Sequence, residues 1–174
     1  MAIRRIIELG DPLLRCKSRE VTAVDQAIET LNDLKDTLHE FQRTHGFGRG
    51  IAAIQIGVPD RVIYIEIAGE TYELINPEIE RQSEEQFEMW DDCFSFPNLM
   101  VRLNRSERVW LRYQDRTGAE RRLEAEWAFA ELLQHEVDHL DGVLSVDRAI
   151  DLKDSLMTRG EYLRTLGKNP LSTF

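Results

Sequence analysis

Hydrophobic residues recur at helical spacing in two segments of the chain, residues 25–44 and 124–141. The apolar positions are Ala27, Ile28, Leu31, Leu34, Leu38 and Phe41 in the first segment, and Trp127, Phe129, Leu132, Leu133, Val137 and Leu140 in the second. The first set marks one face of a helix. The second surrounds most of the circumference, which predicts a central and largely buried helix. Acidic Glu124 and Glu126 suit the N-terminus of this second helix, and Gly142 suits its end.

Short apolar runs between the two helices predict β-strands. These strands cover residues 51–56, 61–67, 72–75 and 108–113. Asn76-Pro77 is expected to stop the third of them, because proline cannot donate a ladder hydrogen bond. The polar run 78–88 fits an exposed strand pair or a loop, and residues 3–9 fit a short strand or an arm.

Strands in the middle of the chain, with one helix before and one after, are typical of an α+β fold. We predict mixed or antiparallel strands packed around the buried second helix, preceded by an N-terminal helix. No linker-like segment interrupts the pattern, so residues 1–150 are expected to form one domain. Residues 151–174 are expected to form a short, weakly helical tail that is not a separate domain.

The buried helix carries His135-Glu136-x-x-His139, which is the strongest chemical signal in the chain. Residues four apart lie on the same face of a helix, so both imidazoles can reach one divalent ion. Glu136 lies at the edge of that face, where a carboxylate can take a proton from a metal-bound water. The alternative is a chance pair of histidines on a buried helix. The chain has only four histidines, and two of them fall at this spacing around a glutamate.

Composition and charge narrow the classes of function. With 174 residues, 42% of them apolar and 31% charged, the chain resembles an ordinary globular domain. A net charge of −10 disfavours nucleic acid as the main partner, because phosphates would be repelled. No apolar run approaches the length of a membrane span, and no signal-peptide pattern follows Met1, so we expect a cytoplasmic protein without membrane contact.

A catalytic metal site commonly has three protein ligands and one open position. No histidine follows His139, and the acidic residues beyond it form no ligand pattern. Upstream, Cys93 stands in a loop-like stretch, and a thiolate there can complete a Cys-His-His site. A disulfide with Cys16, the only other cysteine, would be unusual in a reducing compartment.

Three blocks of the sequence together resemble the peptide deformylase family. Gly48-Arg49-Gly50-Ile51-Ala52-Ala53-Ile54-Gln55 resembles the family pattern Gly-hydrophobic-Gly-hydrophobic-Ala-Ala-x-Gln. Asp91-Asp92-Cys93-Phe94-Ser95 resembles Glu-Gly-Cys-Leu-Ser. The segment from His135 to His139 fits His-Glu-hydrophobic-Asp-His in full. The first two blocks are altered and the third is intact, so the chain resembles a divergent member.

The resemblance implies that Cys93, His135 and His139 hold one divalent metal ion. Family members favour Fe²⁺, with Zn²⁺ or Ni²⁺ as substitutes, and the donor set suits any of the three. The metal-bound water would attack the formyl carbon of an N-formylated peptide. Glu136 would accept the proton of that water as general base and pass it to the departing amine.

The resemblance also assigns the groups around the reacting carbonyl. The side-chain amide of Gln55 and the backbone N–H of Phe94 would stabilise the oxyanion. Gly50, with Gly48, would let a substrate main chain approach closely as an added strand. Asp138 is expected to pair with Arg105 and thereby steady the helix that bears the ligands.

Three charged residues, Arg49, Asp91 and Glu131, fall close to the expected site. Arg49 stands where the family usually has an apolar residue, and Asp91 replaces the usual glutamate. Glu131 lies one helical turn before His135, in a region that the resemblance implies contributes to the apolar substrate pocket. Burying any of them unpaired would be costly, so Arg49 should meet at least one carboxylate. The residues then form an ion-pair network that lines a more polar pocket. Alternatively, Arg49 points to solvent and Glu131 lies outside the pocket, which would leave the specificity unchanged. Asp92 replaces the glycine that precedes the cysteine.

The function implied is removal of the formyl group from formyl-methionine at the start of nascent peptides, with release of formate. A metal-dependent amidase with a more polar side-chain preference is an alternative, and a non-catalytic binding module is another. The intact Glu136 argues against the binding module. The resemblance also allows a transient contact with the ribosome, although residues 151–174 are mixed in charge and do not indicate one.

Overall fold

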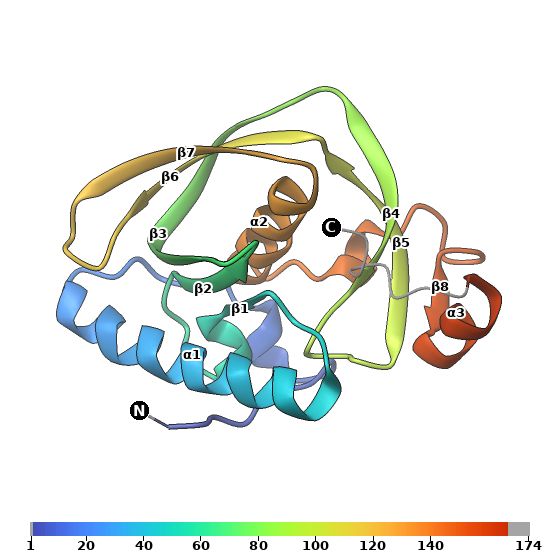
Figure 1. The fold of residues 1–174 in the computed structure, drawn as a ribbon, viewed down its shortest axis with the longest axis horizontal. Coiled ribbons are helices and arrows are strands. Elements are labelled where there is room, and N and C mark those ends of the chain that lie inside the picture. Colours follow the sequence, from blue (N-terminus) through green and yellow to red (C-terminus); the bar gives the residue numbers. More distant parts are fainter. Residues whose placement is uncertain (1, 167–174) are drawn as a thin grey trace.

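A computed structural model describes residues 2–166 of the chain as two antiparallel sheets that meet around one helix (Figure 1). The strands are β1 (Gly50–Ala52), β2 (Val62–Ile67), β3 (Glu70–Gln82), β4 (Gln86–Asp92), β5 (Leu99–Ser106), β6 (Arg108–Gln114), β7 (Glu120–Glu126) and β8 (Leu156–Thr158). The helices are α1 (Val24–His45), α2 (Trp127–Leu140) and α3 (Arg159–Leu166), with short 3₁₀ helices at Pro12–Arg15, Ala53–Ile56 and Ser145–Arg148. This arrangement confirms the predicted α+β class.

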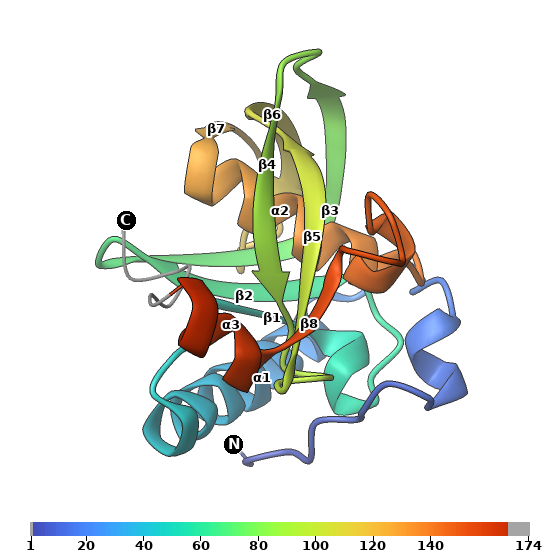
Figure 2. The same ribbon diagram turned by 90° about the vertical axis from the view of Figure 1, so that its right-hand side faces the viewer.

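The larger sheet has the strand order β1-β2-β3-β6-β7, and the smaller has the order β4-β5-β8. Figure 2, turned by 90° from Figure 1, shows the smaller sheet in front of α2. All pairings within the two sheets are antiparallel. Helix α2 contacts strands of both sheets, whereas α1 packs mainly on β1, β2 and β3 of the larger sheet. The helix with the histidines is therefore central, as predicted.

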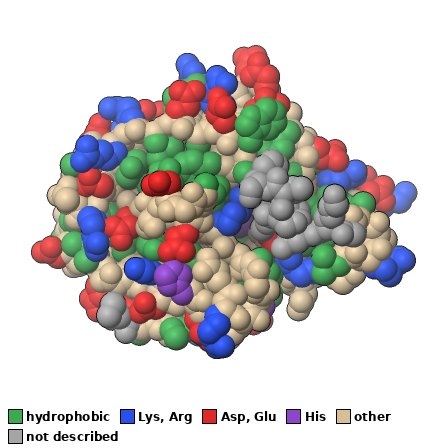
Figure 3. All heavy atoms as spheres, in the orientation of Figure 1, with side chains coloured by type: hydrophobic (Ala, Val, Ile, Leu, Met, Phe, Trp, Pro, Cys, Tyr) green, Lys and Arg blue, Asp and Glu red, His purple; other side chains and the backbone are tan. Residues whose placement is uncertain are grey.

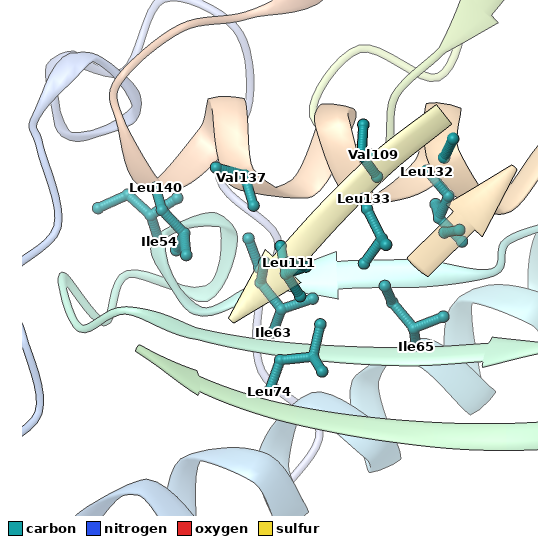
Figure 4. Packing of buried hydrophobic residues seen from close by; sticks show 13 residues of the cluster. Ile54, Ile63, Ile65, Leu74, Val109, Leu111, Leu132, Leu133, Val137 and Leu140 are labelled. Atoms are coloured by element: carbon teal, nitrogen blue, oxygen red, sulfur yellow. The ribbon is translucent and has the colours of Figure 1, made fainter. Parts of the chain in front are cut away.

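Strand β2 explains how the larger sheet carries a helix on each face. Its run Val62-Ile63-Tyr64-Ile65 is apolar without alternation, which is typical of a strand buried on both sides. Ile63 and Ile65 belong to the cluster that includes α2, whereas Val62 and Tyr64 belong to the cluster that includes α1. In Figure 4, Leu133 and Val137 of α2 point toward the sheet residues below them. Burial of these side chains stabilises the position of the histidine-bearing helix by roughly 1.5–3 kcal/mol for each one.

The N-terminus of α2 differs from the prediction. Glu124 and Glu126 lie in β7, not in the first turn of the helix, which begins at Trp127. Strand β7 pairs with β6 in a register that places Gln114 opposite Glu120 at one end and Arg108 opposite Glu126 at the other. This ladder of long-range hydrogen bonds outweighs the local preference of acidic residues for a helix start. Trp127 turns the chain with a φ of 52°.

Several strands differ in extent from the prediction. The segment 51–56 is a strand only to Ala52 and then continues as the 3₁₀ helix that contains Gln55. Strand β3 does not stop at Asn76-Pro77 but continues to Gln82, with a register shift where its pairing with β6 is interrupted. The polar run 78–88 is divided between β3 and β4, so its interpretation as a strand pair is correct.

The segment after residue 150 adds β8 and α3 to the structure. Strand β8 pairs with β5, with Leu99 opposite Thr158 and Val101 opposite Leu156. Residues 167–174 of the predicted tail lie outside the described residues. Within the described part, no helix is both long and apolar enough to cross a membrane. Acidic and basic side chains are interspersed over the face seen in Figure 3.

Candidate active site

Three potential metal ligands converge between α2 and the end of β4. His139 Nε2 lies 3.2 Å from His135 Nε2 and 3.2 Å from Cys93 Sγ. All three ligand atoms lie within 4.8 Å of one another, and all three residues are buried. Tetrahedral coordination with bonds of about 2.0–2.3 Å places ligand atoms about 3.3–3.7 Å apart. The spacing and the donor types therefore fit one divalent ion.

A buried carboxylate orients one of the two imidazoles. Asp91 Oδ2 lies 2.9 Å from His135 Nδ1, and Arg105 Nη2 donates to the same oxygen at 3.1 Å. Burial by itself would raise the pKa of Asp91, but the positive charges of His135 and Arg105 and their hydrogen bonds outweigh burial. The pKa of Asp91 therefore lies well below its usual range. An acceptor at Nδ1 favours the tautomer whose Nε2 lone pair faces the site. Asp91 thus contacts His135, one of the predicted ligands, and does not make the expected contact with Arg49.

Glu136 faces the cavity beside the three ligands. The cavity has a volume of about 20 Å³, and Gly50 and Leu132 also line it. This is room for about one water molecule. Burial raises the pKa of Glu136 to about 7, and its Oε2 has no hydrogen-bond partner. A carboxyl group with a pKa near neutrality can both accept and release a proton.

Gln55, in the 3₁₀ helix Ala53–Ile56, and Phe94, directly after Cys93, lie next to the predicted ligands. The Gln55 side-chain carbonyl accepts from Ala52 N at 2.9 Å, which orients its amide group. Gln55 Nε2 then points at Cys93 Sγ, 3.6 Å away, and at Ser95 Oγ, 3.4 Å away. The ring of Phe94 stacks on Phe41 of α1 at 3.8 Å, which anchors the residue that follows Cys93.

Replacing Gly50 by alanine is expected to impair catalysis by displacing Glu136. A Cβ at this position would lie 2.8 Å from Glu136 Oε1 and 3.1 Å from Leu132 Cδ1. A catalytic group misplaced by about 1 Å can cost about 10²-fold in rate, so kcat should fall by roughly 10–100-fold. Gly160→Ala is the matched control, because its Cβ would meet nothing within 4 Å and its φ is ordinary. Equal kcat values for the two variants would contradict this account of Gly50.

Comparison with known proteins places this site in a family. The family model described as polypeptide deformylase matches residues 3–155. The peptide deformylase of Bartonella tribocorum is 36% identical over 177 residues, covering 97% of each chain, and that of Caldicellulosiruptor bescii is 42% identical over 151 residues, covering 86% and 87%. The chain belongs to the peptide deformylase family. Family members are metalloenzymes, and this deformylase is a hydrolase that removes formyl groups from peptides, as predicted.

Solved deformylase structures share the fold. The crystal structure from Thermotoga maritima has a TM-score of 0.81 at 33% identity, covering 87% of this chain and all of that one. The structure from Synechococcus elongatus in complex with actinonin has a TM-score of 0.81 at 30% identity, covering 97% and 94% of the two chains. The match to the second structure extends beyond the residues that the family model covers.

An ion pair lines the cavity of this deformylase on the side of α2. Arg49 Nη2 lies 2.8 Å from Glu131 Oε2, and Arg49 Nη1 donates to Ala128 O at 3.2 Å. The exposed fraction is 17% for the Arg49 side chain and 4% for that of Glu131. Arg49 therefore does not point to solvent. Burial raises the pKa of Glu131, and the adjacent guanidinium opposes that rise.

The expected contact between Asp138 and Arg105 is present. Arg105 Nη1 donates to Asp138 Oδ2 at 2.6 Å, and the same guanidinium reaches Asp91, so one buried arginine links two carboxylates. Arg148 adds a second cation on Asp138, at 2.6 Å and 2.5 Å from its two oxygens. Sequence reasoning missed Arg148, because no local pattern relates an arginine in a 3₁₀ turn to an aspartate in the preceding helix.

Sequence reasoning also missed Arg159 and Ser95. Arg159, at the start of α3, forms an ion pair with Asp92, and Ser95 contacts the Gln55 amide. Ser95 lies in the block that resembles the family motif, and that position was the available signal. Arg159 lies outside all three blocks, and nothing in the sequence distinguishes it from the other arginines of the chain.

Proposed function

We propose that Cys93, His135 and His139 hold one divalent metal ion and that deformylation takes place at this centre. The convergence of the three ligand atoms beside the unpartnered oxygen of Glu136 supports this proposal most directly. A divalent ion held there would supply Lewis acidity, lowering the pKa of a water molecule and polarising the formyl carbonyl. We propose Fe²⁺ as the native ion, with Zn²⁺ or Ni²⁺ as substitutes, since thiolate and imidazole ligands suit all three.

Glu136 is the proton carrier in this proposal. Its carboxylate accepts a proton from the water that attacks the formyl carbon, and returns that proton to the amine nitrogen as the C–N bond breaks. Gln55 Nε2 and the backbone N–H of Phe94 would donate to the carbonyl oxygen as negative charge develops on it. The orientation of the Gln55 amide by Ala52 N supports its part, because a preorganised donor need not reorient during the reaction.

The substrate proposed is formyl-methionine at the start of nascent peptides in the cytoplasm, with a transient contact at the ribosome. Family membership supports this assignment. The free edge of β1 beside Gly50 supports an extended substrate, because β1 pairs with β2 on one side only within its sheet. A related structure holds actinonin, and we expect the same compound to inhibit this chain.

The decisive experiment measures formate release from formyl-Met-Ala-Ser by protein purified without oxygen, with the metal content determined on the same sample. The proposal expects close to one metal ion per chain, loss of that metal in Cys93→Ala, and inhibition by actinonin. Iron-loaded protein should lose activity in air, because a thiolate ligand is readily oxidised. Full metal content in Cys93→Ala would contradict the ligand set, and air-stable activity would contradict iron.

A second candidate is a deformylase that prefers polar side chains after the formyl group. The ion pair of Arg49 and Glu131 on the cavity wall favours it, because a polar side chain can hydrogen-bond strongly there, whereas a thioether sulfur is only a weak acceptor.

Replacing both members of this pair tests the specificity. Arg49→Ile with Glu131→Leu is expected to raise kcat/KM for formyl-Met-Ala-Ser relative to formyl-Gln-Ala-Ser by roughly 10–200-fold, the range for side-chain discrimination in a pocket. Each single variant should be less stable than the double variant, because it leaves one buried charge unpaired. An unchanged ratio between the two substrates would assign the ion pair to the scaffold and leave formyl-methionine as the preferred substrate.

A further inference from the structure

The C-terminal helix α3 packs on the outer face of β4, the strand that leads into Cys93. Side chains alternate along a strand, so Trp90 and Asp92 share the face opposite to Asp91. Positions three apart share a helix face, so Arg159 and Tyr162 of α3 can meet this pair together. The rings of Trp90 and Tyr162 lie 5.9 Å apart, and Arg159 forms an ion pair with Asp92.

Arg159 contacts segments on either side of Cys93 in the fold. Its guanidinium pairs with Asp92, which lines the cavity, and its Nε donates to Pro97 O at 2.6 Å. The guanidinium also lies 4.0 Å from the centre of the Phe47 ring, a cation–π contact. Phe47 directly precedes the glycine-rich segment that contains Gly50.

The backbone of Arg159 is also held in place, by a hydrogen bond. Arg159 N donates to Asn98 O at 2.8 Å, which continues the pairing of β8 with β5. The exposed fraction is 15% for the Arg159 side chain and 6% for that of Asp92. Each charge is thus largely withdrawn from water and depends on the other for compensation.

We propose that Arg159 is a positioning residue for the metal centre, acting through Asp92 on the adjacent Cys93. The Asp92 carboxylate occupies a position where the family pattern has glycine, so this chain has a buried charge directly before its cysteine ligand. Arg159 compensates that charge through its ion pair with Asp92, and so holds the residue that precedes Cys93 in place. It lies beyond residues 3–155, which the family model matches.

This inference rests on the proposed role of Cys93 as a metal ligand, and its test separates the two. Protein loaded with Co²⁺ is mixed with excess EDTA, and the decay of the thiolate-to-cobalt absorption band reports loss of the ion from Cys93. Removing a residue that orients a metal ligand typically costs 10–100-fold in metal affinity. Arg159→Met should therefore lose Co²⁺ roughly 10–100-fold faster than the unchanged protein, and its kcat should fall.

A double variant distinguishes positioning from general destabilisation. Asp92→Gly combined with Arg159→Met removes both charges, and its Co²⁺ loss should return to within about threefold of the unchanged protein, a non-additive result expected of a coupled pair. Arg164→Met is the matched control, because Arg164 lies in the same helix and pairs with Glu161 at the surface. It should lose Co²⁺ at the original rate.

Any one of three results with Arg159→Met and the double variant would overturn the proposal. Arg159→Met could release Co²⁺ at the rate of Arg164→Met, the double variant could lose it as fast as Arg159→Met, or the loss could simply follow global unfolding in urea. If Arg159→Met does not fold, Arg159→Lys keeps the charge without the planar fork and should show an intermediate rate. A rate equal to that of the unchanged protein would also overturn the proposal. A Co²⁺ band that survives Cys93→Ala would instead contradict the ligand assignment itself.

Discussion

Replacing Glu136 by glutamine is expected to lower kcat for formate release by about 10²–10⁴-fold, the usual contribution of a general base. Glutamine has nearly the same shape but cannot accept the proton of the attacking water. The metal content should stay unchanged, because Glu136 is not among the three converging ligands. The free energy of unfolding should not fall, since burial of this carboxylate is unfavourable, as its raised pKa of about 7 indicates.

Two measurements accompany this prediction. Metal content and kcat are determined on the same preparation, so that loss of the ion is not mistaken for loss of the base. Glu124→Gln is the matched control, because Glu124 lies in β7 with half of its side chain exposed. Full activity in Glu136→Gln would show that another group accepts the proton, and loss of the metal would make Glu136 part of the binding site.

Replacing Arg105 by methionine is expected to lower the free energy of unfolding by about 3–5 kcal/mol, the cost of breaking a buried ion pair on one side. Arg105 is 2% exposed and is the cation between Asp91 and Asp138. Without it, Asp91 keeps only the contact with His135, so the orientation of that imidazole should also suffer. Metal affinity should consequently fall by about 10–100-fold.

Urea unfolding of the metal-free and metal-loaded protein separates these two effects. Arg122→Met is the control, because Arg122 makes comparable ion pairs on the surface, where such pairs contribute about 0–1 kcal/mol. A loss below about 1 kcal/mol in Arg105→Met would mean that the carboxylates are stabilised by other groups. Arg148, which contacts Asp138 with two nitrogens, would be the first to examine.

The sequence predicted the central helix and its histidines well because both are encoded locally. Helical spacing alone places His135 and His139 on one face, and the apolar residues around them predict burial. The same reasoning was wrong for Glu124 and Glu126. Acidic residues favour a helix start, but Glu124 and Glu126 lie in β7, which pairs with β6 along its whole length. A local sequence pattern does not indicate which strand will pair with a segment.

Long-range pairing also explains the strand errors in the prediction. Strand β5 (Leu99–Ser106) was missed, although Met100, Val101 and Leu103 are fully buried. Its sequence mixes these residues with Arg102 and Arg105, which hides the alternation of a strand. Because Arg105 points inward to meet two aspartates, its charge does not mark an exposed position.

The sequence by itself predicted the helix with the two histidines and the glutamate between them, because helical spacing depends on contacts within a few residues, and the order of the elements predicted the fold class. The tertiary structure decided most of the partners of the charged residues around the site, although the contact of Asp138 with Arg105 was expected from the sequence. Asp91 contacts His135, Arg49 contacts Glu131, and Asp92 contacts Arg159 across 67 residues of chain. Such choices depend on the packing of α2, α3 and β4 against one another, since a buried charge pairs with whichever opposite charge the fold brings within reach.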